Sequence, residues 1–332
     1  MKILHLLNDL NIYGGTPKKI FDLSKKSENE HFIYTWHKVL GEKETNDIVK
    51  LFSNAGCLVF ENYIGKSTIK HLITLKSHVL KHDIDVIHCY FYYGELLGAF
   101  FKFFFNRKVK VVVSFVGSNN PNGFKKHLLS VCYRMIDQFV FNSNYTFNAK
   151  VSNFSYLNRT NNIIIYNGVE LIKKPAIKYN GGENSIKMIS VGGLTKIKNH
   201  IVLLRAMKLL RDFTSKTLIL EIYGDGQYFE FLNKYIIENN LENIVKLKGY
   251  SAEIENELIN FDFYLHPCYA EGFGISVIEA MYSGKMVMCA NNGALPELLK
   301  NKSGLLLDKD DHEIWAKTIL ELSTNSNIVL EY

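Results

Sequence analysis

Short segments rich in β-branched and aromatic residues alternate with helical patterns along nearly the whole chain, and this alternation restricts the fold more than any other feature. The strand candidates of the first half are residues 2–7, 31–39, 57–60, 85–90, 109–115, 138–141 and 163–166. Helical patterns lie near 16–27, 67–81, 94–105, 124–136 and 144–152. Such alternation is typical of a mostly parallel sheet with helices on both faces.

The stretch LIKKPAIKYNGGENS at 171–185 interrupts this rhythm, because it is polar and carries a proline and a Gly-Gly pair. Strand candidates then resume at 187–192, 217–224, 244–249, 261–267, 286–290 and 304–308, with helices near 199–211, 227–239, 252–260, 275–283, 295–299 and 311–322. We therefore expect an α/β protein of two doubly wound Rossmann-like domains, residues 1–172 and 186–332, joined by a linker at 173–185. A ligand is expected in the cleft between them.

One segment of the second half, HPCYAEGFGISVIEAMYSGK at 266–285, has the composition of an anion site. Gly272 and Gly274 allow close approach of backbone N–H groups, and the helix that follows offers unpaired donors with a partial positive charge. A carboxylate such as Glu271 would repel a phosphate there but can accept hydrogen bonds from sugar hydroxyls. Glu279, one to two turns along the helix, can reach a ribose. The pattern favours a nucleotide-diphosphate sugar.

Charge is unevenly distributed over the chain, whose net charge is +6. Residues 1–172 hold 21 Lys and Arg against 13 Asp and Glu, whereas the remainder holds 18 against 20. A basic first half indicates an anionic partner. Nucleic acid is disfavoured, because the sequence has no basic stripe, zinc-finger spacing or RNA-binding aromatic motif.

Cysteine usage and hydropathy indicate a protein of the cytoplasm. The five cysteines are scattered and include no CxxC pair, which argues against a disulfide framework or a zinc site. The opening MKILHLLND has too short an apolar run for a signal-peptide core. The most apolar segment, residues 94–105, is shorter than the roughly 20 residues that a spanning helix needs, so no transmembrane segment is expected.

The motif E-G-F-G-x4-E-A-M-x2-G is similar to the donor-site motif of retaining glycosyltransferase family four, whose members have the GT-B fold. Four other segments resemble that family in the same order: MKILHLLNDLNIYGGTPKK (1–19), IIIYNGVE (163–170), SVGGLTKIKNH (190–200) and EIYGDG (221–226). The resemblance covers about residues 1–320.

This resemblance implies a role for each matching position. Glu271 would contact hydroxyls of the transferred sugar, Glu279 would contact the nucleotide ribose, and Lys198 would neutralise the departing diphosphate; Glu271 and Lys198 are thus the catalytic candidates. The other donor-binding candidates are one further lysine and a set of loop positions: Lys196, Gly14, Gly15, Gly193, Gly224, Gly272, Phe273, Gly274 and Ile275. The family requires no metal ion or cofactor and retains anomeric configuration.

The sequence also departs from the family pattern. Gly193 stands where the family usually has Arg, so Lys196 or Lys198 would have to compensate for one missing cation. Val116 stands where the family often has a histidine at the transferred sugar. His88 is a candidate substitute, although a histidine at a strand end is more often packed and hydrogen-bonded. The family's last helix, which crosses back to the first domain, is expected to be short or absent.

These observations predict a cytoplasmic, metal-independent hexosyltransferase that uses a nucleotide sugar, with UDP as the favoured nucleotide. The acceptor would be a growing glycan such as a lipid-linked precursor of lipopolysaccharide or capsule. Residues 66–82 and 100–108 carry apolar and basic side chains, and they either cover the core or dock the first domain on an anionic membrane. Two alternatives stay open: a nucleotide-sugar epimerase on the same scaffold, and an inactive partner subunit that binds a nucleotide sugar.

Overall fold

The computed structural model describes residues 1–10, 15–37, 42–65, 67–105, 108–169, 184–251 and 253–325. The chain divides into two compact units, Met1–Gly168 and Val169–Tyr332. Most of the predicted linker at 173–185 lies outside the described residues.

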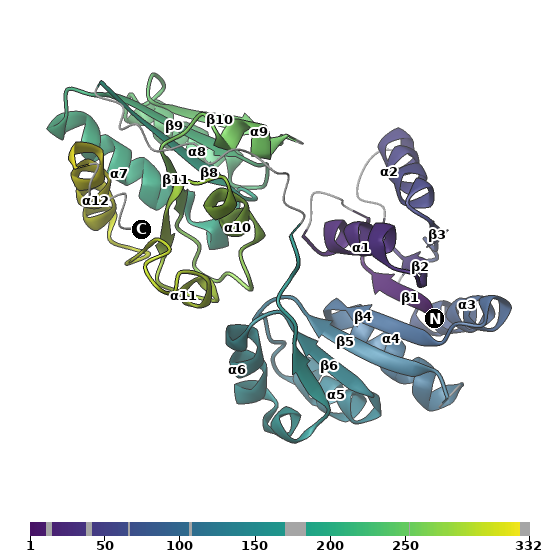
Figure 1. The fold of residues 1–332 in the computed structure, drawn as a ribbon. Helices are drawn as coiled ribbons and strands as arrows, with labels where there is room; N and C mark the ends of the chain where they lie inside the picture. Colours follow the sequence, from purple (N-terminus) through teal and green to yellow (C-terminus); the bar gives the residue numbers. More distant parts are fainter. Residues whose placement is uncertain are drawn as a thin grey trace. The chain divides into compact units, whose positions relative to one another are not determined.

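The first unit is built on a seven-stranded parallel sheet of order β3-β2-β1-β4-β5-β6-β7 (Figure 1). Its elements in chain order are β1 (Lys2–Leu7), α1 (Gly15–Lys26), β2 (Glu30–Thr35), α2 (Glu42–Asn54), β3 (Cys57–Glu61), α3 (Thr68–His82), β4 (Val86–Tyr90), α4 (Phe91–Phe104), β5 (Lys110–Phe115), α5 (Phe124–Cys132), η1 (Tyr133–Met135), β6 (Gln138–Phe141), α6 (Asn144–Asn153), η2 (Ser155–Arg159) and β7 (Asn162–Ile164).

Helices cover both faces of this sheet, as the sequence predicts. On one face α3, α4 and α5 bury the larger apolar cluster, which includes Leu75, Leu97 and Leu129. On the other face α1 and α2 contribute Ile20 and Phe52 to a smaller cluster. The strands on this side also carry the buried His5 and His31 and the half-buried His88, which are discussed below.

The second unit repeats the plan with a six-stranded parallel sheet of order β10-β9-β8-β11-β12-β13. Its elements are β8 (Ser185–Val191), η3 (Lys196–Lys198), α7 (His200–Phe213), β9 (Thr217–Tyr223), α8 (Phe229–Glu238), β10 (Val245–Gly249), α9 (Ile254–Leu258), β11 (Phe263–His266), α10 (Ile275–Tyr282), β12 (Met286–Ala290), α11 (Leu295–Leu298), β13 (Leu305–Leu307) and α12 (His312–Thr324). The strand order reverses between β8 and β11, the kind of point at which such sheets bind ligands.

Two details of the first unit differ from the sequence-based expectation. Helix α2 was not predicted, because its sequence EKETNDIVKLFSN is mostly polar and only its second half reaches the core. The segment 66–82 was expected either to cover the core or to dock on a membrane, and α3 is not of one kind: Leu72 and Val79 are buried, but Ile69, Ile73 and Leu80 are exposed.

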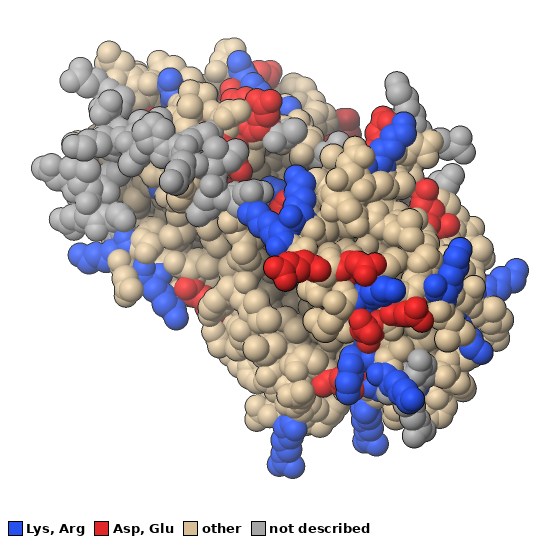
Figure 2. All heavy atoms as spheres, turned by 45° about the vertical axis from the view of Figure 1, so that its right-hand side comes forward, with Lys and Arg blue, Asp and Glu red and all other residues tan. Residues whose placement is uncertain are grey.

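The surface and the helix lengths bear on possible partners. Figure 2 shows basic side chains mixed with acidic ones on the face of the first unit that is turned forward, so the basic excess of that half is not one unbroken patch there. Among the described residues, no helix combines the length and hydrophobicity required to cross a membrane. All five cysteines are free and buried.

Candidate functional site

The loops that follow β8, β9, β11 and β12 join at one end of the second sheet. Backbone hydrogen bonds hold them to one another. The Gly192 N–H donates to the backbone carbonyl of Tyr223 at 2.9 Å. The Tyr269 N–H donates to the backbone carbonyl of Ile197 at 2.8 Å, and the Ala294 N–H donates to the backbone carbonyl of Glu271 at 2.9 Å. Because these bonds join segments far apart in the sequence, the side chains that the loops carry are held in a fixed arrangement.

Glycines permit the closest of these approaches. Gly224 has φ +138°, and a Cβ there would overlap the carbonyl of Gly192. Gly192 in turn lies beneath the side chain of Lys198, whose Cδ would be 3.5 Å from a Cβ built at Gly192. The Gly-Gly loop and the Gly-Asp-Gly turn therefore support each other and leave room for the lysine stem.

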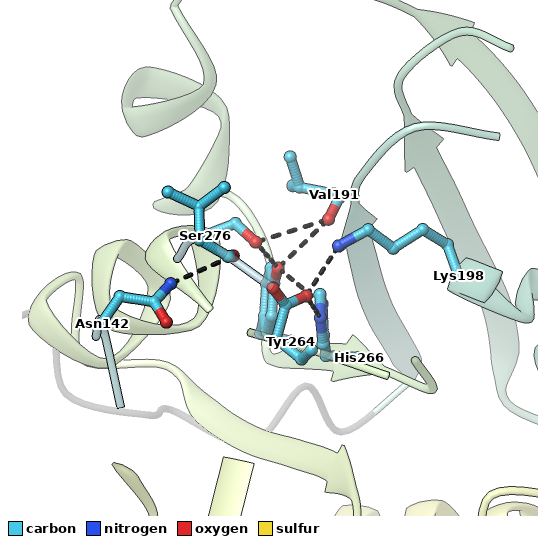
Figure 3. Close-up of polar contacts among 8 residues, drawn as sticks. Asn142, Val191, Lys198, Tyr264, His266 and Ser276 are labelled. Carbon is cyan, nitrogen blue, oxygen red and sulfur yellow. Dashed lines mark hydrogen bonds and ion pairs between the residues drawn. The ribbon is translucent and has the colours of Figure 1, made fainter. Parts of the chain in front are cut away.

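At the centre of these loops lies a network of three charged or polar side chains, Lys198, His266 and Glu271, which we call the Glu271 network (Figure 3). Lys198 Nζ lies 2.6 Å from Glu271 Oε2, and His266 Nε2 lies 2.9 Å from the same oxygen. The Glu271 side chain is 14% exposed and that of Lys198 is 27% exposed, whereas His266 is buried. The carboxylate can thus meet a ligand only over a small part of its surface.

The network holds one negative and one positive charge. Burial alone would raise the pKa of Glu271, but the hydrogen bond from His266 and the charge of Lys198 outweigh it and hold that pKa well below its usual range. Burial alone would lower the pKa of Lys198, but Glu271 outweighs it and raises that pKa. Burial also lowers the pKa of His266, so its imidazole is neutral at physiological pH.

A second chain of polar contacts joins His266 to the start of α10 (Figure 3). The Tyr264 hydroxyl donates to Ser276 Oγ at 2.8 Å and lies 3.4 Å from His266 Nδ1. Both hydroxyls also face the Val191 carbonyl, at 3.4 Å from Tyr264 and 3.5 Å from Ser276. Since Ser276 is the second residue of α10, these contacts connect the helix start to the Glu271 network.

Three side chains of the site have the spacing of a metal centre. Ligand atoms of His266, Cys268 and Glu271 all lie within 4.8 Å of one another, and no other such group occurs in the described ranges. Lys198, however, already places a cation 2.6 Å from the carboxylate. Burial raises the pKa of the Cys268 thiol to about 11, so without a metal ion this thiol is protonated at neutral pH. We interpret the group as an ion-pair network.

Helix α10 begins where the sequence predicts an anion site. Its N-cap Gly274 has φ +101° and lacks a side-chain cap, so amide donors remain at the helix start. Of the neighbouring donor candidates, Phe273 is buried, while Gly272 and Ile275 are half-buried. Glu279 is buried one turn further along the helix.

The loop after β12 packs against the backbone of Glu271. Gly293 has φ +66°, and a Cβ there would lie 2.5 Å from the Glu271 carbonyl oxygen and 2.7 Å from its nitrogen. Asn292 Nδ2 donates to the Tyr269 carbonyl at 2.6 Å. These two residues therefore hold the glycine loop that carries the carboxylate.

The remaining predicted residues lie at the edges of this arrangement or in the first unit. Lys196 and Gly193 are exposed beside Lys198. Gly15 is the first residue of α1, and Gly14 lies outside the described residues. Val116 follows β5, and its carbonyl accepts a hydrogen bond from Asn142 at 3.1 Å.

His88 is held by protein groups at both ring nitrogens. Its Nε2 lies 2.7 Å from Ser114 Oγ and its Nδ1 lies 3.2 Å from the Tyr90 hydroxyl. Burial lowers the pKa of His88 to about 3. These contacts favour the packed, hydrogen-bonded role over a contact with a sugar.

Several residues of the site were not recognised in the sequence. His266 and Tyr264 lie on β11, two residues apart and therefore on one face, and they end a strand just before the glycine loop. That alternation was an available signal. Asn292 and Gly293 gave none, because their effect depends on a loop that follows a different strand.

The comparison with protein families decides which class this arrangement belongs to. Residues 174–330 match the family model described as Glycosyl transferases group 1. The second unit therefore matches this family over nearly its whole length. The matched range contains every residue of the Glu271 network and of helix α10.

Relatives and solved structures agree with this assignment. An uncharacterized glycosyltransferase of Methanocaldococcus jannaschii is 25% identical over 331 residues, 95% of this chain and 86% of its own length. An N-acetylgalactosaminyltransferase of Campylobacter jejuni, named for a diphospho-undecaprenol-linked acceptor, is 30% identical over 61% of this chain and 56% of its own. The Anabaena protein HepE, solved with UDP and glucose, matches with TM-score 0.78 and 21% identity over 99% of this chain and 91% of its own. The chain thus has the GT-B fold, as predicted.

Proposed function

We propose that this protein is a group 1 glycosyltransferase, a retaining hexosyltransferase of family four that takes its sugar from a UDP-linked donor. The observation that carries the proposal is the ion pair of Lys198 and Glu271, 2.6 Å long, at the loop that leads into α10. It combines a cation for a leaving diphosphate with a carboxylate for sugar hydroxyls. HepE, a fold relative, has been solved with UDP-glucose, which supports UDP as the nucleotide to test first.

In this proposal the diphosphate rests against the start of α10. The backbone of Gly272, Phe273, Gly274 and Ile275 would line the diphosphate and sugar, and Glu279 would contact the ribose. The Lys198–Glu271 pair is neutral as a whole, so it cannot by itself offset a diphosphate. The additional positive potential would come from the helix start and from exposed Lys196, because Gly193 supplies no side chain.

Catalysis would then depend on positioning and on electrostatic support of the departing UDP. Lys198 would stabilise the charge that develops on the diphosphate, and Glu271 would orient the sugar while the acceptor attacks from the face that UDP leaves. No metal ion is required in this scheme, because a lysine and a helix start replace it. Activity that persists in excess EDTA would support this point, and loss that added Mg²⁺ restores would contradict it.

The acceptor side is proposed from the first unit. Helix α3 exposes Ile69 (71%), Ile73 (60%) and Leu80 (61%), which fall on one stripe of the helix, with Lys76 in the same stripe. Phe103 and Phe104, at the end of the adjoining α4, are also exposed. Apolar side chains flanked by lysines suit shallow contact with an anionic membrane. We accordingly propose a lipid-linked glycan acceptor and a cytoplasmic enzyme at the inner face of the plasma membrane.

A panel of UDP-sugars, incubated with and without lipid-linked acceptors, tests the proposal. UDP release that requires an acceptor supports transfer. Interconversion of the sugars without acceptor would indicate the epimerase. Binding without turnover would indicate an inactive partner subunit, the alternative that Gly193 and Val116 motivate. Glu279→Ala should weaken UDP binding measured by calorimetry by about tenfold, the loss of one hydrogen bond to a charged group; unchanged affinity would remove the ribose assignment.

A further inference from the structure

His266 is a buried imidazole that contacts the one carboxylate of the Glu271 network. It lies at the end of β11, five residues before Glu271, and its ring is stacked beside Tyr264 with centroids 6.1 Å apart and an interplanar angle of 12°. At 2% exposure it is too enclosed to meet a substrate. Any effect on the reaction must therefore pass through the groups that it touches.

The contacts of His266 assign its tautomer. A carboxylate can only accept hydrogen bonds, so a neutral imidazole 2.9 Å from Glu271 Oε2 must carry its proton on Nε2. Nδ1 is then an acceptor, and the one proton of the Tyr264 hydroxyl is shared between Nδ1, 3.4 Å away, and Ser276 Oγ, 2.8 Å away. Tyr264 also bonds Ser276 on the first turn of α10. The same strand thus contacts the carboxylate on one side and the helix start on the other.

Lys198 and His266 approach the same oxygen of Glu271 from different elements. Lys198 comes from η3 and is 27% exposed at its side chain, so it can exchange partners when a diphosphate arrives. His266 has no such freedom, because packing encloses its ring. When Lys198 turns to the phosphate, His266 remains as the donor that keeps the Glu271 carboxylate in place.

We infer that His266 is a positioning residue that fixes the Glu271 carboxylate for the donor sugar and, through Tyr264 and Ser276, links it to the diphosphate end of the site. This inference rests on the proposed donor site and goes beyond it, because it assigns a role to a residue that cannot touch the donor. It predicts that changes at His266 affect recognition of the sugar and spare recognition of UDP.

Variants at position 266 can separate positioning from packing. His266→Gln places an amide N–H near the position of Nε2, whereas His266→Phe fills the volume without a donor. The measurement is the ratio of UDP affinity to UDP-sugar affinity by calorimetry, with whichever of UDP-glucose, UDP-galactose or UDP-N-acetylglucosamine the wild type prefers to UDP. We expect His266→Phe to lose about tenfold in UDP-sugar affinity, the value of one hydrogen bond to a charged group, with UDP affinity unchanged. His266→Gln should retain most of the affinity.

The opposite pattern would overturn the inference. If His266→Phe binds the UDP-sugar as tightly as His266→Gln or more tightly, His266 is a packing residue. If the affinities for UDP and for the UDP-sugar fall together, the substitution disturbs the whole donor site and not sugar recognition alone. His200→Gln is the matched control, since His200 is a buried histidine of the same unit whose Nδ1 has no hydrogen-bond partner. Equal loss of UDP-sugar affinity in that variant would also refute a specific role for His266.

A ligand-free measurement keeps the inference testable if the variants do not fold or no UDP-sugar binds. Long-range ¹H–¹⁵N spectra of wild-type protein should show His266 as the neutral Nε2–H tautomer at pH 7–8, with a pKa below the ordinary histidine value. An Nδ1–H tautomer, or titration near the ordinary histidine pKa, would overturn the contact on which the role depends. Failure of every UDP-sugar to bind would refute the proposed function and leave this result to decide on His266.

Discussion

Each unit of this protein buries histidines on its central strands, but their surroundings differ. In the first unit His5 Nε2 lies 2.9 Å from His31 Nδ1, and His5 is paired in register with His88 on β4. We call His5, His31 and His88 the histidine row. Burial is the largest cause that lowers the pKa of His5, and the charges of His88, His31 and Lys19 lower it further. In the second unit, Glu271 opposes the effect of burial on His266.

The difference shows that the hydrogen-bond partner of a buried histidine decides whether it can position another side chain of a site. His200, buried in the second unit, has its pKa lowered to about 3, mainly by burial, and His266 and Lys198 act in the same direction. His88 reaches a similar value. Only His266 has a carboxylate at hydrogen-bond distance among these residues, so it can donate to Glu271 while it stays neutral. The histidine row, in contrast, fills space and makes the fold sensitive to acid.

The largest expected effect comes from replacing Lys198 of the Glu271 network, compared with replacing Lys19 near the histidine row. In the proposed mechanism Lys198 contacts the leaving diphosphate, so Lys198→Met should lower turnover about 100-fold; it also leaves Glu271 without its cation. Lys19→Met removes the half-buried lysine near the histidine row, whose Nζ bonds Asn167 at 3.0 Å, and turnover should stay within about threefold. The measurement is acceptor-dependent UDP release. Equal losses would erase the functional contrast between the two clusters.

The fold followed from the sequence because buried parallel strands are continuous apolar runs. Residues 138–141 and 286–290 were predicted with the bounds that β6 and β12 have. Helix α2 was not predicted because only its second half, with Ile48, Val49 and Phe52, faces the core. Periodicity alone does not separate the buried Leu72 and Val79 of α3 from the exposed Ile69 and Ile73, because a second apolar stripe on the same helix cannot be told from the buried one without its neighbours.

Sequence reasoning could identify site residues only where they lie close together in the chain or at the end of a strand. The glycine loop and Glu271 lie together in one segment, and Lys198 follows a strand end, so both could be named. A lone histidine before a proline reads as packing. The role of His266 depends on Tyr264 opposite, on Glu271 after the loop and on Ser276 of the next helix, and only the folded sheet brings these together.

The next effect concerns the loss of stability of the first unit at acidic pH. A histidine with a folded-state pKa near 3 and an unfolded value near 6.5 contributes stability that is complete above 6.5 and is lost as pH falls. His88 alone should lower the free energy of unfolding of the first unit by about 2 kcal/mol between pH 7 and pH 5. Fluorescence can measure this unit separately, because the two tryptophans, Trp36 and Trp315, lie one in each unit.

The experiment uses Trp315→Phe protein, in which Trp36 alone reports, with and without His88→Gln. The denaturant midpoint of the His88→Gln form should fall less between pH 7 and pH 5, because Gln does not bind a proton. Equal slopes in the two proteins would mean that His88 is already charged or exposed in the folded state. The histidine row would then not be the acid-sensitive element that distinguishes the first unit.

The smallest expected contrast, about 1–2 kcal/mol between two glycine variants, tests whether the Glu271 network depends on the backbone that carries it. Gly293→Ala and Gly249→Ala both place a side chain at positive φ, +66° and +72°, but only at Gly293 does the new Cβ meet the Glu271 backbone, whereas nothing lies within 4 Å at Gly249. Each should lose about 1 kcal/mol from the backbone conformation, and Gly293→Ala about 1–2 kcal/mol more from overlap. Denaturant unfolding followed by Trp315 in the second unit measures both. If the two variants were equally stable and bound UDP-sugar equally, the loop would be able to yield, and the rigid placement that separates the Glu271 network from the histidine row would be lost.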